Sequence, residues 1–590
     1  MDADKQNSLT LSWKNINAWT KPKLKIYEKK KLLQNVCGIA RSGCLTTILS
    51  PSGAGKTTLL AALSKRYKDC LDGEILLNGK EVNQELMSNI SGYVCQKDLI
   101  LENLTVKEHL TFTAQMKMDK SLSEFSRIKR ILAVVENLSL SHRINVQISS
   151  LSGGQRKRLS LATQLLTGPR ILFCDEPTTG LDSFSAFSVL KLLRSLTNEG
   201  KIIICTIHQP ASGIFELFDE VTLLASGGTL AYHGPVSEVL NYFSNLGINC
   251  PKNYNTSDFI ISQITVRSPS VEGSEKDKER VHNLIVSFRK SKIYEKLKNE
   301  LNEASQNQNF IKTRNKINHI PFRTEFSWLL WRSALQISRS YKMCCLSFPF
   351  GTIQMDQLGV QNTQGFMHCL VMEILYSSLY GVAHAVPEDL PVFIQESADK
   401  LYSPHSYYFS KLVVLSTKAL IETCIYTNYA LSVTGLNRTL NDYIVTSFPL
   451  LLISLVSSAY GFFLSTTFES VTTFSLFSVP FELICQAYGG LILRLNSLPV
   501  YTAWLKYISF VFYAYEALAI QLWTKQKHIQ CNESNVNDCK YRSGNEVLMS
   551  FGFSSNDILM DYFGLIIYFI VLHSFSFFFL LRKLKRSVAY

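Results

Sequence analysis

The sequence has few charged residues for its length. Of its 590 residues, 18 % are charged and 46 % are hydrophobic, and the mean hydropathy is +0.07. Such a chain is too apolar for several ordinary soluble domains and too charged to lie wholly within a membrane. The composition therefore predicts two unlike halves, one soluble and one membrane-embedded.

The chain also lacks an apolar run near residue 1. Residues 1–31 are polar and rich in lysine, and the long apolar runs lie after residue 340. No cleavable signal is expected from this pattern. We expect the first half to stay in the cytosol.

Neither a metal centre nor a nucleic-acid surface is indicated. Twelve of the 14 cysteines are scattered without metal-ligand spacing, and only Cys531 and Cys539 stand apart from them. The net charge of +13 comes from dispersed basic residues, several of them in Arg582–Arg586. Membrane proteins carry such charge on the cytosolic side. We therefore expect a lipid membrane as a partner and no nucleic acid.

A phosphate-binding loop is the first motif that points to chemistry. The segment Ser50–Thr58 reads SPSGAGKTT, follows the strand-like run Leu45–Leu49 and precedes an apolar helical pattern. Its glycines let the backbone wrap phosphates, its lysine reaches phosphate oxygens, and its first threonine offers a hydroxyl to Mg²⁺. The usual first glycine is Ser50 here, a position that shapes the entry turn, so we expect nucleotide affinity to be reduced at most. The expected ATP contacts are Ser50, Pro51, Ser52, Gly53, Ala54, Gly55, Lys56, Thr57 and Thr58.

Two adjacent carboxylates form a second motif. The run Ile171–Cys174 is typical of a buried strand, and it delivers Asp175 and Glu176 at its carboxyl end, where parallel α/β sheets place their ligands. Burying unpaired charge is costly, so a metal ion, a proton to be taken up, or both would explain the pair. Asp175 then suits Mg²⁺, and Glu176 suits a general base that polarises water. A salt-bridged strand end is the structural alternative.

The third motif opens a helical stretch between the other two. Ser152, Gly153, Gly154 and Gln155 combine a capping hydroxyl with two residues that lack side chains. Bare backbone N–H groups at the positive end of a helix can meet an anion. A Gly-Gly turn before a helix is more often only a cap.

Together with three further segments, these motifs resemble the ATPase domain of ABC transporters in every motif and in order. The further segments are Gln96 in GYVCQKD, Asp182 in GLDS and His208 in TIHQP. The sequences RKR at 156–158, DEPTTGLDS at 175–183 and CPKNYNTSDF at 250–259 are similar to subfamily G, especially its insect white and scarlet pigment-precursor group. The resemblance covers roughly residues 8–266 and 323–590. It implies an α/β P-loop ABC ATPase domain followed by an all-α transmembrane domain of six helices.

The resemblance also implies roles for single residues. It implies catalysis by Glu176, His208 and Gln96, Mg²⁺ ligation by Thr57, Gln96 and Asp175, and further ATP contacts by Ser152, Gly153, Gly154, Gln155 and Asp182. An aromatic residue before the loop often stacks on adenine in this family, and Tyr27 is a candidate, although packing is its commoner role.

The expected domains follow the same division. We expect a cytosolic ATP-binding domain at 1–266, a charged cytosolic linker at 267–322, an amphipathic connecting helix at 323–342 and a transmembrane domain at 343–590. Segments of about 20 apolar residues can span a bilayer. They are expected near 365–386, 412–434, 443–465, 471–493 and 563–581.

That is one span fewer than the family has, and the shortfall lies at the first helix. The apolar stretch available there, 343–353, has only 11 residues, about 16 Å of helix against a hydrocarbon core of about 30 Å. We expect this stub to lie along the interface; the alternative is that residues 327–353 cross and carry three basic residues inward. A transcript or gene model lacking one exon is predicted, with ATP binding intact and transport impaired.

Several polar segments and residues are expected within the membrane half. The resemblance makes Pro387–Ser410 the cytosolic loop with the coupling helix and places Glu396 in its acidic position, while Lys418 and Glu422 lie one helical turn apart and should neutralise one another. Residues 494–562 are expected to form a polar, extracellular or luminal loop. It holds a disulfide candidate, Cys531 with Cys539, which could alternatively link to a partner subunit, and a glycosylation candidate, Asn532 in Asn-Glu-Ser.

The resemblance implies an ATP-driven half-transporter that needs Mg²⁺ and works as a homodimer or as a heterodimer with another subfamily G chain. Its implied substrate is a small hydrophobic or aromatic molecule, such as a pigment precursor derived from tryptophan or guanine. A sterol or lipid exporter, or a transport-deficient truncated isoform acting as a regulatory subunit, are the alternatives. The expected location is the plasma membrane or a pigment-granule or lysosome-related membrane, with the ATPase domain and the carboxyl terminus in the cytosol.

Overall fold

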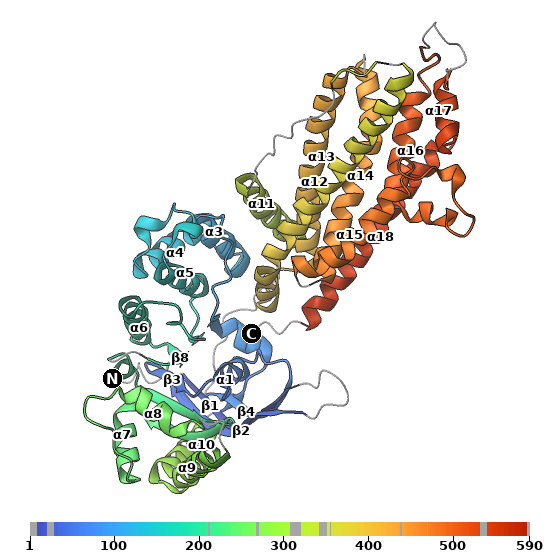
Figure 1. The fold of residues 1–590 in the computed structure, drawn as a ribbon. Helices are drawn as coiled ribbons and strands as arrows, with labels where there is room; N and C mark the ends of the chain where they lie inside the picture. The colour runs from blue at the N-terminus through green and yellow to red at the C-terminus, as the bar shows by residue number, and fades with distance from the viewer. Residues whose placement is uncertain are drawn as a thin grey trace. The chain divides into compact units, whose positions relative to one another are not determined.

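The computed structural model divides the chain into two compact units, Met1–Ile320 and Pro321–Ala589 (Figure 1). The predicted order, an α/β domain followed by an all-helical one, is confirmed. The structure describes residues 9–20, 29–210, 213–266, 271–306, 320–340, 351–354, 356–436, 439–468, 470–530 and 540–586.

A ten-stranded sheet in the order β5-β4-β1-β2-β10-β9-β3-β8-β7-β6 organises the first unit. Its first four strands pair antiparallel, whereas β9, β3, β8, β7 and β6 run parallel. The strands are β1 (Thr10–Trp19), β2 (Lys31–Arg41), β3 (Leu45–Leu49), β4 (Cys70–Leu77), β5 (Lys80–Glu81), β6 (Ser91–Val94), β7 (Ile171–Cys174), β8 (Ile202–Ile207), β9 (Glu220–Ala225) and β10 (Thr229–Pro235).

The parallel strands are buried on both faces, which explains their unbroken apolar runs. Helices α3, α4 and α5 form a group of their own beside the sheet (Figure 1). The helices of this unit are α1 (Lys56–Leu63), α2 (Gln84–Ile90), α3 (Val106–Lys117), α4 (Glu124–Asn137), α5 (Gly153–Leu165), α6 (Ser183–Thr197), α7 (Val236–Asn245), α8 (Thr256–Ile264), α9 (Val271–Lys290) and α10 (Lys292–Gln306).

Helices α9 and α10 occupy much of the range expected to be a charged linker, 267–322. The Phe288 ring of α9 is fully buried, with its centroid 5.8 Å from that of Tyr232 on β10. Glu300 of α10 pairs with Arg41 at 2.6 Å. One apolar side of each charged helix covers the sheet, so over these residues the stretch is part of the first unit rather than a free linker.

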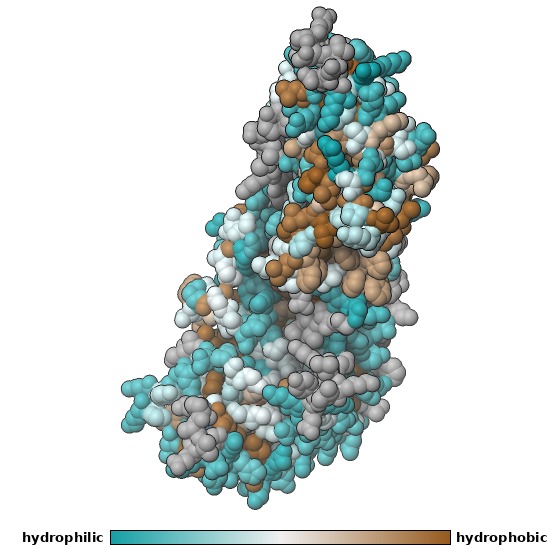
Figure 2. Space-filling view, turned by 45° about the vertical axis from the view of Figure 1, so that its right-hand side comes forward, coloured by the Kyte–Doolittle hydropathy of each residue, from teal (hydrophilic) through white to brown (hydrophobic). Residues whose placement is uncertain are grey.

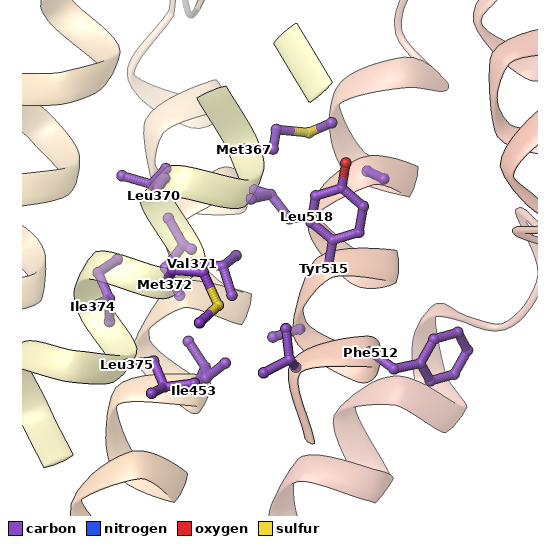
Figure 3. Close-up of a cluster of buried hydrophobic side chains, with 14 of the residues drawn as sticks. Met367, Leu370, Val371, Met372, Ile374, Leu375, Ile453, Phe512, Tyr515 and Leu518 are labelled. Carbon is purple, nitrogen blue, oxygen red and sulfur yellow. The ribbon is translucent and has the colours of Figure 1, made fainter. Parts of the chain in front are cut away.

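The second unit is helical. It contains α11 (Phe322–Ser340), α12 (Gln357–Ala398), α13 (Pro404–Thr434), α14 (Leu440–Thr467), α15 (Val471–Ala487), α16 (Phe510–Trp523), α17 (Gly544–Phe551) and α18 (Ile558–Arg586). Its core lies between α12, α14 and α16, where Met367, Leu375, Ile453 and Leu518 are buried together (Figure 3).

Four of the five expected spans lie within helices, and the fifth, 471–493, begins on α15 and runs past its end at Ala487. Among the described residues, three helices are long and apolar enough to cross a membrane: Gln357–Ala398, Leu440–Thr467 and Ile558–Lys585. Helix α13 carries charged residues and α15 has only 17 residues. Figure 2 shows hydrophobic residues gathered over a broad area of the second unit. The exposed apolar side chains there include Leu476, Phe477, Leu483, Phe563, Ile567 and Ile570.

Two segments of this unit that were expected to be loops contain more helix than expected. Helix α12 runs through Pro387 and Pro391 to Ala398, so only residues 399–403 remain of the loop expected at 387–410. Prolines are tolerated within membrane helices because neighbouring helices can satisfy the backbone groups that they leave unbonded. Residues 494–562 are not wholly polar either, because the buried apolar helix α16 lies within them. The predicted contact of Lys418 with Glu422 is confirmed, with Nζ 3.8 Å from Oε1.

Helix α11 covers residues 323–340 of the range expected for the connecting helix, and most of its buried residues are polar. The Arg332 guanidinium binds Glu396 at 2.7 Å and the Tyr402 hydroxyl at 3.2 Å. Gln336 Nε2 donates to Asp389 at 2.5 Å. Residues 341–350, which hold most of the expected stub at 343–353, lie outside the described residues.

Candidate active site

The loop at 50–58 connects β3 to α1, as predicted. Gly53 and Gly55 have φ angles of 76° and 99°, in the region that favours glycine. A Cβ on Gly55 would also lie 2.8 Å from the Leu33 side chain. No side chain caps α1, so its first N–H groups remain available to an anion. The geometry fits a phosphate cradle.

Lys56 is the buried cation of this loop. Its side chain folds back, and Nζ donates to the carbonyls of Ser50 at 2.9 Å and Pro51 at 3.4 Å. Burial lowers the pKa of Lys56. The Ser50 hydroxyl is fully buried and donates to the Pro51 carbonyl at 3.0 Å. Serine therefore fits where the motif usually has glycine.

Asp175 lies at the end of β7 between two threonine hydroxyls. Thr206 Oγ1 donates to Asp175 Oδ1 at 2.6 Å, and Thr57 Oγ1 donates to the same atom at 3.2 Å. Burial raises the pKa of Asp175, while these two hydrogen bonds oppose the rise. The predicted neighbours Thr57 and Asp175 are thus brought together.

The donor set fits Mg²⁺ held jointly with a nucleotide. Within the described part of the chain, no group of three His, Cys, Asp or Glu side chains could hold a metal ion. Mg²⁺ commonly takes one or two protein oxygens and completes its shell with water and substrate phosphates. Thr57 and Asp175 supply two such oxygens beside the cradle.

Glu176 follows in a strained backbone conformation, with a φ of 43°. Its Oε2 accepts hydrogen bonds from Gln96 Nε2 at 2.6 Å and from Thr179 Oγ1 at 2.9 Å. Its backbone N–H donates to Thr206 Oγ1 at 2.8 Å. Thr206 therefore fixes both carboxylate residues, and the structure joins Gln96 directly to Glu176, a contact that the sequence had not predicted.

The signature residues cap α5. Gln155 N donates to Ser152 Oγ at 3.4 Å, and Ser152 N donates to Gln155 Oε1 at 3.2 Å. Gly153 is exposed like Ser152. A Cβ on Gly154 would lie 3.1 Å from Ser185 Oγ, so the two helix starts approach closely. Ser152 and Gln155 therefore cap α5, and Ser152 and Gly153 are exposed at its start.

Two predicted residues stand apart from this cluster. Asp182 caps α6 by accepting from Ser185 N at 3.0 Å, and hydrogen bonds from Ser185 lower the pKa of Asp182. His208 is exposed beyond β8, and among the described residues no hydrogen bond joins it to Glu176. The candidates Tyr27, Cys531, Asn532 and Cys539 lie outside the described residues.

The model of the ABC transporter family matches residues 33–179, and that of the ABC-2 type transporter matches residues 324–523. The chain is 31 % identical to protein scarlet of Drosophila melanogaster, over 98 % of this chain and 90 % of that protein. It is 34 % identical to protein white of the same organism, over 91 % and 81 %.

The chain belongs to subfamily G of the ABC transporters. It is a half-transporter, with one ATP-hydrolysing domain and one membrane domain. It is also 30 % identical to the broad substrate specificity ATP-binding cassette transporter ABCG2 of Rattus norvegicus, over 89 % of this chain and 86 % of that protein.

The structure of the half-transporter adds residues that the motifs missed. Thr206 lies beside Asp175 because Cys174 pairs with Cys205 in the sheet, a register that only the structure shows. Thr179 lies three residues after Glu176, within hydrogen-bonding range at a turn. Lys157 gave no comparable signal, because its partners at 95–98 are distant in sequence.

Proposed function

We propose that this half-transporter binds Mg²⁺ and ATP at the loop 50–58 and hydrolyses ATP with Glu176 as the general base. The hydrogen bond of 2.6 Å from Gln96 to Glu176, next to the contact of Thr57 with Asp175, is the observation that supports this most directly. Because Asp175 and Glu176 are consecutive residues, these contacts support a metal ligand and a general base side by side.

Binding falls to the loop and its lysine. The backbone N–H groups at the start of α1 and the Lys56 ammonium hold the phosphates, for which Lys56 must leave the carbonyls of Ser50 and Pro51. Thr57 and Asp175 would hold Mg²⁺, which would supply charge neutralisation at the phosphates. Asp182 and His208 would join the site through the nucleotide.

Hydrolysis needs a positioned water and an acceptor for its proton. Glu176 Oε2 accepts two hydrogen bonds, from Gln96 and Thr179, and these fix the carboxylate while Oε1 takes the proton. Gln96 can then orient the attacking water. The strained backbone of Glu176 presents the side chain at the strand end.

Dimerisation completes the site. Ser152, Gly153, Gly154 and Gln155 lie at the start of α5, with Ser152 and Gly153 exposed, and would contact ATP held by the loop of a partner subunit. A homodimer, or a heterodimer with another subfamily G chain, then holds two nucleotides. Closure on ATP and reopening after hydrolysis would drive the membrane unit.

Glu176→Gln tests the assignment of the base. The amide keeps the shape and cannot take the proton, so hydrolysis should fall by about 10²- to 10⁴-fold while ATP binding persists. Both quantities are measured on the full-length chain in lipid vesicles. Glu85→Gln, exposed at the start of α2, is the matched control. Turnover at the wild-type rate in Glu176→Gln would remove Glu176 from its role.

For the substrate we propose a small hydrophobic or aromatic molecule, such as a tryptophan- or guanine-derived pigment precursor. The similarity to scarlet and white supports this choice. A sterol or lipid exporter remains the alternative within the subfamily, and a transport-deficient regulatory subunit the alternative outside it. Substrate-stimulated ATPase activity, alone and with a paralogous partner, separates these functions.

We further propose a plasma-membrane or pigment-granule location with a cytosolic ATPase domain, and a disulfide between Cys531 and Cys539. Thiol labelling of intact cells before and after reduction tests both ideas. Thiols that become reactive only after reduction support an oxidised loop outside the cytosol. Free thiols in both conditions would contradict the disulfide and the orientation.

A further inference from the structure

Lys157 is a buried lysine two residues beyond the signature motif. It lies in α5 with 1 % of its surface exposed. Its Nζ donates to the carbonyls of Cys95 at 3.1 Å and Gln96 at 3.0 Å, and to Asp98 Oδ1 at 3.0 Å. These three acceptors match the three donors of an ammonium group. Lysine is almost never fully buried unless it is paired, and here every partner belongs to one short segment.

That segment, residues 95–98, carries Gln96 into the active site. Lys157 holds the backbone of Gln96, while the side chain of Gln96 reaches Glu176 at 2.6 Å. The placement of Lys157 therefore decides where the amide of Gln96 lies relative to the base. A shift of about 1 Å in a positioning group can cost about 100-fold in rate.

The same helix begins at the signature. Ser152 caps α5, and the five residues from Ser152 to Lys157 span about 7.5 Å of helix axis. The backbone hydrogen bonds of α5, a helix of 13 residues, hold its first turn and Lys157 at a fixed spacing. Any displacement of its first turn therefore reaches the Lys157 ammonium, and through it the Gln96 segment.

We propose that Lys157 is a positioning residue that links the signature of one subunit to the general base of that same subunit. Docking of the signature on a nucleotide held by the partner fixes the position of α5. Lys157 then fixes the position of the Gln96 segment, and the Gln96 side chain fixes the orientation of the Glu176 carboxylate. The two ATP sites of the dimer are thereby coupled through one buried side chain. The inference rests on the proposed function, in which Glu176 is the base and the signature meets the partner's nucleotide.

Arg156 provides a matched control. It precedes Lys157 on α5, but its guanidinium contacts Glu102 at 2.7 Å and the Ser149 carbonyl at 3.0 Å, away from the Gln96 segment. The Glu102 side chain is 58 % exposed. Arg156→Met therefore removes a neighbouring positive charge from the same helix without touching residues 95–98.

The test compares Lys157→Met, Arg156→Met, Gln96→Ala and the double variant Lys157→Met/Gln96→Ala in the full-length chain in lipid vesicles. We measure kcat, ATP affinity and the Hill coefficient for ATP. Lys157→Met should lower kcat by about 10- to 100-fold, leave ATP affinity unchanged and lower the Hill coefficient. Arg156→Met should leave kcat within about fivefold, as expected for an exposed ion pair.

The double variant decides whether Lys157 acts through Gln96. If it does, the double variant turns over no more slowly than the slower single variant, because residues that act as a unit are not additive. Losses that multiply would overturn the proposal and leave Lys157 with a merely structural role. An unchanged Hill coefficient in Lys157→Met would also overturn it.

Asp98→Asn keeps the test decisive if Lys157→Met folds poorly. It keeps an oxygen acceptor for Lys157 but removes the ion pair, so a smaller fall in kcat with normal ATP affinity supports the proposal. Loss of ATP affinity in both variants would overturn it, since these side chains would then support the phosphate loop. A failure of Glu176→Gln alone would instead contradict the proposed base, so the two failures can be told apart.

Discussion

In the first unit, the buried charges Lys56, Asp175 and Glu176 meet at one edge of the sheet, and Lys56 is bonded to carbonyls of its own loop. In the second unit, Arg332 with Glu396, and Lys411 with Asp389, pair across helices. Over the part of the chain that the structure describes, Lys56 forms no ion pair, and its ammonium contacts only carbonyl oxygens. In the second arrangement each cation pairs with a carboxylate on another helix, so the ion pairs connect α11 and α13 to α12. The contacts of Lys56 thus favour a role in binding, and the pairing of Arg332 and of Lys411 favours a structural role.

The largest expected effect tests the paired side of this comparison. Arg332→Leu leaves Glu396 and Tyr402 without their cation, and breaking a buried pair typically costs about 3–5 kcal/mol. Thermal unfolding of the detergent-solubilised chain, followed by hydrogen exchange in α11, measures the loss. Arg323→Leu, exposed on the same helix, is the control. If both variants lost equal stability, the pair would not be structural and the comparison would break.

The second prediction concerns His233, a buried histidine of the first unit that is not part of the proposed ATP site. His233 Nε2 accepts from Ile39 N at 3.2 Å, and its Nδ1 lies 2.9 Å from the Thr222 hydroxyl, so it joins β2, β10 and β9. Burial lowers the pKa of His233 to about 4 from its usual 6.5. The unfolded chain therefore takes up the proton first as the pH falls.

The stabilisation by neutral His233 is present above about pH 6.5 and is lost as the pH falls towards 4, on the order of 3 kcal/mol. Hydrogen exchange in β2 and β10 at pH 7.5 and pH 5 measures this loss. His233→Gln should flatten the pH dependence of the exchange, whereas the exposed His142→Gln should leave it unchanged. An equal slope in wild type and His233→Gln would show that another group dominates.

The smallest expected effect tests the role of Lys56 in the first unit. Lys56→Ala removes a charge-assisted contact to phosphate, worth about 2 kcal/mol or about 30-fold in ATP affinity. The fold should persist, because Lys56 lacks a carboxylate partner that would be stranded. Binding of a fluorescent ATP analogue, with the exposed Lys191→Ala as control, measures the change. An unchanged affinity would remove Lys56 from the phosphate site.

Local spacing carried most of the predictions for the first unit. The loop at 50–58 and the strand before Asp175 depend on neighbours in sequence, so their positions could be derived from residue order. The resemblance supplied Gln96, whose bond to Glu176 joins residues 80 apart. Lys157 could not be found this way, because a lysine in a polar helix gives no hint of burial until its distant acceptors are placed.

The second unit shows where periodicity fails. Helix α16 has 14 residues, too few for the span pattern, and lies in a segment expected to be polar throughout. Pro387 was expected to end a helix that continues for eleven more residues. The polar contacts of α11 likewise depend on tertiary packing. Length thresholds and proline rules describe isolated segments, whereas packed neighbours decide these cases.

Helix α12 can be considered as a mechanical part. Its 42 residues make a rod about 63 Å long, roughly twice the thickness of a hydrocarbon core. Pro387 and Pro391 lack the N–H groups that would bond the carbonyls of Ala383 and Pro387, so the rod is most compliant between residues 383 and 391. Glu396 binds Arg332 in the last turns of α12. A force applied to these turns would bend the helix between residues 383 and 391 before it displaced the apolar part of the helix that precedes them.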